Sequence, residues 1–235
     1  MIEKFKSVHW KLYRAKEHMD ELARVLAGYY KSSPGEMVLD SGTFAFREKI
    51  PVPARIPLIV GDFLQNVRSA LDYLVWELVI ANGCIPGQHN AFPIDLTLAS
   101  YQSSVTKRRR LEGIDNRAAA IIDAMQPYHC KNNAEKENAP LVILDRLTNI
   151  NKHRRVLLAT IGSNIAPVGD PPRFFINVDY TVKTGSGIIK EANKMVAFVT
   201  LSEGPIKGLE ISGAIDALAR FVIEETLPPF EKFFK

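Results

Sequence analysis

Residues 149–155, with the sequence NINKHRR, combine side chains suited to acid–base catalysis and to anion binding. A histidine exchanges protons near neutral pH, and arginine and lysine bind phosphate or carboxylate groups. These polar residues sit late in an otherwise apolar run that has the pattern of a partly buried helix. This stretch is therefore the best candidate in the chain for a functional site.

The helix that carries this stretch is predicted to begin after Asn138 and Pro140 and to end near Ile161. Spacings of three and four residues place one line of positions on its core-facing side: Leu147, Ile150, Arg154, Leu157 and Ile161. Burying an unpaired guanidinium costs several kcal/mol, so Arg154 must find a carboxylate or a solvated cavity.

A second predicted helix, residues 57–81, could supply that carboxylate. Its Arg68 and Asp72 are spaced i,i+4 and can pair with each other on one helix. If this helix and the N-terminal one pack against residues 140–161, a polar pocket forms. Its members would be Asp62, Arg68, Asp72, His153 and Arg154, with His18 as a further candidate.

Besides a merely solvated polar face, two interpretations of this pocket are open at the level of sequence. In the first it is a structural network of Arg–Asp pairs that fixes how the helices pack. In the second His153 is a general acid and base, Arg154 and Arg68 hold an anion, and Asp72 orients them.

The rest of the pattern predicts an α+β fold, a mainly helical bundle core of about four to five helices with a small antiparallel sheet. Helices are expected at 2–30, 57–81, 115–125 and 140–161, with a short one near Tyr101 and a kinked one at the C-terminus. A hairpin is expected near 36–50. Further strands are expected in RFFINVDYTV, GSGIIK and KMVAFVTLS. We expect a single domain over 1–235, with the helical core about 1–162 and the sheet plus terminal helix about 172–235.

Composition limits the class of protein. The chain has 235 residues, 46% hydrophobic and 24% charged, which is ordinary for a globular protein. The net charge of +4 permits an anionic partner without requiring one. No signal peptide or membrane-spanning run is visible, and two cysteines are too few for a disulfide scaffold. We therefore expect a cytoplasmic protein that does not enter a membrane.

The segments GDFLQNVRSALDY, FPI and NINKHR resemble an uncharacterised family of bacterial proteins with the pattern D-x-x-H-N-x-R-x-x-L-D-H, then F-P-I, then N-x-D-K-H-R. The resemblance covers about residues 58–160. Gln65 and Tyr73 stand where that pattern has His, and Asn151 where it has Asp. The positions that match are Asp62, Asn66, Arg68, Asp72, Asn149, Lys152, His153 and Arg154. It implies no established activity, but it marks Asp62, Asn66, Asn149 and Lys152 as binding candidates.

A looser resemblance is to HEPN-like helical proteins, many of which are ribonucleases that work without a metal and pair as dimers. Their R-x(4–6)-H signature places an Arg on the scissile phosphate and a His as the acid and base. Arg146 and His153 fit it as R-x6-H, although Leu147 stands where a polar residue usually follows the Arg, and the C-terminal sheet is a further departure. The resemblance implies an RNA-processing or defence-type ribonuclease that forms a homodimer. The alternative is a non-catalytic helical module that binds a small anion or a partner protein.

Other candidate sites are weaker. A basic run, Lys107, Arg108, Arg109 and Arg110, could guide an RNA backbone, or it could be an ordinary solvated loop. The spacings of Cys84, His89, His129 and Cys130 fit no familiar zinc pattern, so no metal site is expected. No nucleotide or flavin fingerprint is present, and no cofactor is expected. A base-stacking surface would need exposed aromatic rings with Lys or Arg between them.

Overall fold

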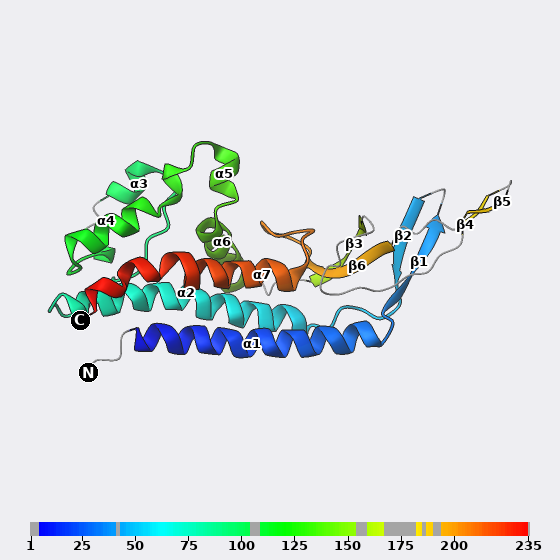
Figure 1. The fold of residues 1–235 in the computed structure, drawn as a ribbon, viewed down its shortest axis with the longest axis horizontal. Helices are drawn as coiled ribbons and strands as arrows, with labels where there is room; N and C mark the ends of the chain where they lie inside the picture. Colours follow the sequence, from blue (N-terminus) through cyan, green and yellow to red (C-terminus); the bar gives the residue numbers. More distant parts are fainter. Residues whose placement is uncertain are drawn as a thin grey trace.

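The structure is a computed structural model that describes residues 5–40, 43–103, 109–153, 159–166, 182–184, 187–189 and 194–234. Four longer helices form its body: α1 (Lys6–Lys31), α2 (Arg55–Ala81), α6 (Pro140–His153) and α7 (Ile211–Arg220). α1 and α2 lie side by side and antiparallel, α7 runs along α2, and α6 packs against α2 and α7 (Figure 1). With its small sheets, this bundle confirms the predicted α+β class.

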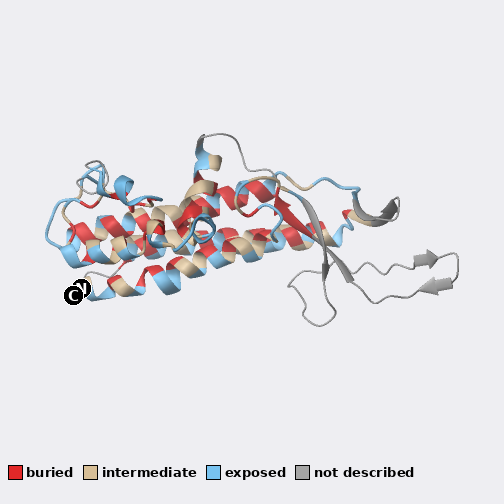
Figure 2. Ribbon diagram, turned by 90° about the horizontal axis from the view of Figure 1, so that it is seen from above, coloured by how far each residue is buried: buried red, intermediate tan, exposed pale blue. Residues whose placement is uncertain are grey.

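The two long helices form because apolar residues recur on one side of each. Along α1 the buried positions include Val8, Ala15, Leu22 and Leu26, at steps of seven, seven and four residues. α2 buries about half of its circumference, because it contacts α1 on one side and α6 and α7 on the other. Buried residues accordingly follow the inside of the bundle along its length (Figure 2).

Three short helices connect α2 to α6: α3 (Leu98–Gln102), α4 (Asn116–Ala124) and α5 (Asn133–Glu137). Each begins at a residue whose side chain accepts a hydrogen bond from a backbone N–H of the first turn, namely Thr97, Asp115 and Asn132. The helix predicted at 115–125 is confirmed as α4, with Asp115 as its N-cap. Asn138, predicted to begin the next helix, instead caps the C-terminal end of α5.

The strands form two-stranded antiparallel sheets. β1 (Gly35–Asp40) pairs with β2 (Thr43–Glu48) and confirms the predicted hairpin, with Met37 opposite Phe46. β3 (Ala159–Ala166) pairs with β6 (Lys194–Leu201), and β4 (Val182–Thr184) with β5 (Gly187–Ile189). Of the strand predicted in RFFINVDYTV, residues 173–181 lie outside the described residues.

The prediction that the helix of NINKHRR continues to Ile161 is wrong. Ile161 lies in β3, opposite Val199 of β6. The apolar run VLLATIG satisfies a strand as well as a helix, and pairing with β6 decides between them. Position 161 therefore does not continue the core-facing line of α6, and residues 154–158, which include Arg154 and Leu157, lie outside the described residues.

The C-terminal segment ends α7 in two irregular turns. A π-helical turn, Phe221–Thr226, is followed by a 3₁₀ turn, Pro228–Phe233, so the predicted break at Pro228-Pro229 is confirmed. Phe230 is fully buried and anchors this end of the chain. None of the helices in the described ranges is long and apolar enough to cross a membrane.

Candidate functional site

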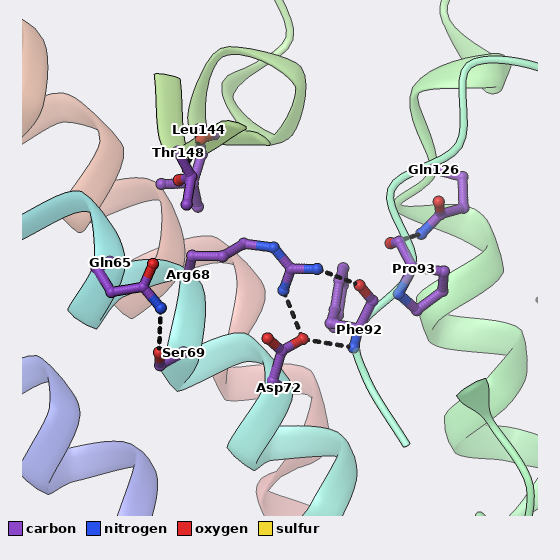
Figure 3. Close-up of polar contacts among 9 residues, drawn as sticks. All are labelled: Gln65, Arg68, Ser69, Asp72, Phe92, Pro93, Gln126, Leu144 and Thr148. Carbon is purple, nitrogen blue, oxygen red and sulfur yellow. Dashed lines mark hydrogen bonds and ion pairs between the residues drawn. The ribbon is translucent and has the colours of Figure 1, made fainter. Parts of the chain in front are cut away.

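The predicted pair of Arg68 and Asp72 exists, and it binds a third partner. One terminal nitrogen of Arg68 donates to Asp72 Oδ1 at 2.6 Å, and the other donates to the carbonyl oxygen of Phe92 at 2.9 Å. The N–H of Phe92 donates to the same Asp72 oxygen at 3.0 Å. The side chains of Arg68 and Asp72 thus bind the carbonyl oxygen and the N–H of Phe92 (Figure 3). They join the FPI segment, residues 92–94, to α2.

The extended segment 90–95 is held along its whole length by such contacts. The side-chain amide of Asn90 donates to the carbonyls of Arg110 and Glu112, and the N–H of Ala91 donates to the carbonyl of Arg110. Gln126 donates to the carbonyl of Pro93 and accepts from the N–H of Asp95. The segment therefore ties the end of the basic run to α2.

The outer side of α6 presents a strip of polar residues. Asn149 and Lys152 are exposed, and Asp145 and Arg146 are partly buried one to two turns earlier. On the inner side, Thr148 is buried and its hydroxyl donates to the carbonyl of Leu144. His153 is the last residue of the helix, seven positions after Arg146 and hence nearly two turns further on the same side.

Asp145 lies at the centre of the charges in this region. Burial raises the pKa of its carboxyl above the usual range, while Arg68, Arg110 and Lys152 act in the opposite direction. The Asn149 amide also donates to it, at 2.9 Å. The charges of Arg68 on α2, of Arg110 and of Lys152 on α6 therefore all act on one carboxylate. We call Arg68, Asp72, Arg110, Asp145, Asn149 and Lys152 the Asp145 cluster.

Close packing of two helices sets the position of this end of α6. The side-chain amide of Asn151 lies directly against Gly61 of α2, where a Cβ would come within 2.7 Å of its nitrogen and its oxygen. The absence of a side chain at Gly61 lets the helices approach, so Lys152 is brought to the edge of α2.

The remaining predicted residues fall into three groups. Arg146 pairs with Glu137 of α5, and Arg109 is exposed in the loop beside Arg110. Asp62 is exposed, and the side-chain amide of Asn66 donates to the backbone carbonyl of Asp62, so neither is part of the cluster. The residues outside the described part of the chain are Lys107, Arg108, Arg154 and the side chain of His153.

The further members of the predicted pocket lie elsewhere. His18 is buried within α1, and Arg14 pairs with Glu17 of its own helix. Asp145 was not predicted, although it stands four residues before Asn149, a spacing that brings two side chains together on a helix. Within the described ranges, no group of three or more His, Cys, Asp or Glu side chains is arranged to hold a metal ion.

Asp145 leads to a prediction about stability and pH. Because its pKa is higher in the folded chain than in the unfolded one, the ionised carboxylate opposes folding above the raised pKa, and this cost disappears as the pH falls below the unfolded value. Asp145→Asn should therefore melt at a higher temperature than the wild type at pH 7. The difference should close towards roughly pH 4. Thermal melts at several pH values measure this, and a less stable variant at pH 7 would contradict it.

No protein-family model, curated protein or solved structure matches this chain at a significant level.

Proposed function

We propose that the chain binds the phosphate groups of RNA at the Asp145 cluster and cleaves the RNA without a metal ion, with His153 as the acid and base. The observation that supports binding is that Arg110, at the end of the basic run, and Lys152, on the outer side of α6, both act on the charge of Asp145, to which the Asn149 amide donates. Cationic and amide donors on one exposed strip suit a phosphodiester.

Catalysis is supported by the helical relation of Arg146 and His153. A metal-independent ribonuclease needs a proton acceptor for the 2′-hydroxyl and a cation on the phosphate. Both residues belong to one uninterrupted helix and lie on one side of it, with Asn149 between them. Arg68 and Asp72, in this proposal, position the surrounding chain and do not contact RNA.

A non-catalytic module that binds a small anion or a partner protein is the second candidate. It is favoured by the pairing of the guanidinium groups: Arg68 is occupied by Asp72 and Phe92, and Arg146 by Glu137. An arginine held by a carboxylate is a weaker phosphate ligand than a free one, because a bound anion must compete with its partner.

The first test is cleavage of a mixed single-stranded RNA pool in the presence of a chelator. Cleavage supports the ribonuclease, and RNA binding without cleavage supports the module.

The resemblance also implies a homodimer, which sedimentation measures directly. The expected cytoplasmic location follows from the sequence and is tested by fractionation.

Binding should depend on the two cluster cations that face solvent. Arg110→Gln with Lys152→Gln removes two positive charges and should weaken RNA binding about equally for all sequences. The slope of log K against log salt should fall in magnitude by about 1.4, since each phosphate contact to a single strand contributes about 0.7. Filter binding over a salt series measures both. The matched control is Arg24→Gln on exposed α1, which should change neither.

A further inference from the structure

The aromatic face of the bundle consists of exposed rings on α1 and α2. Trp10 exposes 65% of its surface, Trp76 40% and Tyr73 39%. Large aromatic side chains are usually buried when a fold leaves room for them, so three exposed rings on two neighbouring helices indicate a binding surface.

These rings lie together because of how α1 and α2 are aligned. The backbone N–H of Ser7 donates to Glu77 at 2.8 Å, and Lys11 Nζ lies 5.6 Å from the centre of the Tyr73 ring. In this antiparallel register Trp10, close to Ser7 and Lys11 on α1, lies beside the stretch of α2 that bears Tyr73 and Trp76. The two helices run side by side here (Figure 1).

Cations are interleaved with the rings. Lys6 Nζ lies 5.1 Å from the centre of the Trp10 ring, and Lys11 covers Tyr73. Of the four basic residues from Lys6 to Lys16, Arg14 pairs with Glu17 and Lys16 with Asp20. The carboxylate of Glu77 is occupied by the N–H of Ser7. Lys6 and Lys11 therefore supply the positive charge at the rings that a polyanion would meet.

We propose that this aromatic face is a base-stacking platform for single-stranded nucleic acid. The proposal names the substrate form for the proposed function, which it extends, but its evidence is separate. An exposed cation–π contact is worth less than stacking of a base on an aromatic ring, so a base displaces the Lys11 ammonium group from Tyr73, and Lys11 then binds the adjacent phosphate.

The platform adjoins the Asp145 cluster. Trp76 follows Asp72 by four residues and lies one turn further on the same side of α2. A strand whose phosphates contact Arg110 and Lys152 can therefore continue over α2 and place its bases on Trp76, Tyr73 and Trp10. A double helix keeps its bases stacked inside, so the platform selects single strands.

Tryptophan fluorescence tests the proposal, because Trp10 and Trp76 are the two tryptophans of the sequence and both belong to the aromatic face. The probe is an oligothymidylate of about 12 nucleotides. It should quench the emission, and an abasic sugar–phosphate strand of equal length should not. By polarisation of labelled oligothymidylate, Trp10→Ala should bind about tenfold more weakly, and Trp10→Phe should retain most of the affinity.

Ile223→Ala is the matched control, since Ile223 is a large exposed residue outside this face and its loss should leave binding unchanged. Binding of both strands with equal affinity, or no quenching at saturation, would overturn the proposal. One further outcome would also overturn the proposal: tryptophan emission that changes with protein concentration in the absence of nucleic acid, together with a dimer that Trp10→Ala dissociates. That outcome would assign the aromatic face to a second copy of the chain. The oligothymidylate probe lacks the 2′-hydroxyl, so it reports base stacking independently of cleavage. If it stacks on the protein while RNA is not cleaved, the proposed ribonuclease is rejected and the base-stacking platform is retained.

Discussion

Replacing Arg68 by Ala should lower the free energy of unfolding by about 3 kcal/mol. The Arg68 side chain is only 13% exposed, and its loss removes two hydrogen bonds at once. The carbonyl of Phe92 then has no donor, and Asp72 loses its counter-charge. For a chain of this length the melting temperature should fall by roughly 10 °C. Urea unfolding measures the change.

Two comparisons separate this effect from a general loss of packing. Gln65→Ala, one turn earlier on α2, removes only a contact to Ser69 of the same helix and should cost less than about 1 kcal/mol. A cycle with Asp72→Ala should show coupling between the two sites. A stable Arg68→Ala variant that no longer binds RNA would contradict the structural role of Arg68 and would assign Arg68 to RNA binding.

The long helices could be predicted from sequence because their signals are local. The repeats in α1 and α2 are long and regular, and the pair Arg68–Asp72 follows from i,i+4 spacing alone. The third partner could not be found in this way. Phe92 belongs to a segment without periodicity, and its backbone meets α2 through contacts twenty residues or more apart in sequence.

The end of α6 shows where local reasoning fails. Leu157 and Ile161 continue the helical spacing, but Ile161 is paired with Val199 in β3 and β6. The decisive interaction is between strands that are distant in sequence, so no pattern within residues 140–161 could reveal it. The same limit applies to Arg110, which approaches Asp145 because Asn90 and Ala91 bind its carbonyl.

The solvent exposure of a side chain is the other property that could not be predicted from the sequence. Trp10 and Trp76 occupy positions that a helical pattern alone does not separate from core positions, and only the packing of α1 on α2 leaves them on the surface. Tyr73, which departs from the bacterial pattern that has His, is exposed beside Lys11. Tyr in place of His at position 73 weakens an acid–base role for this residue, but it provides an aromatic ring on which a base can stack.

The second large effect is expected at His153. His153→Ala should reduce metal-independent RNA cleavage about 10²- to 10⁴-fold, the range that a positioned general acid or base contributes. The residue ends α6, so its loss should not disrupt the helix, and the melting temperature should stay close to that of the wild type. Single-turnover rates measure the effect.

His129→Ala is the matched control, because His129 is half-exposed beside Asp123 and is not part of the Asp145 cluster.

Glu137→Gln tests Arg146, the other residue of the proposed catalytic pair. Removing the carboxylate releases Arg146 from its ion pair, so cleavage should rise if Arg146 holds the scissile phosphate. Cleavage that survives His153→Ala and is unaffected by Glu137→Gln would reject α6 as the catalytic element. RNA binding at the Asp145 cluster could still hold, because binding depends on Arg110 and Lys152 and not on a proton at His153.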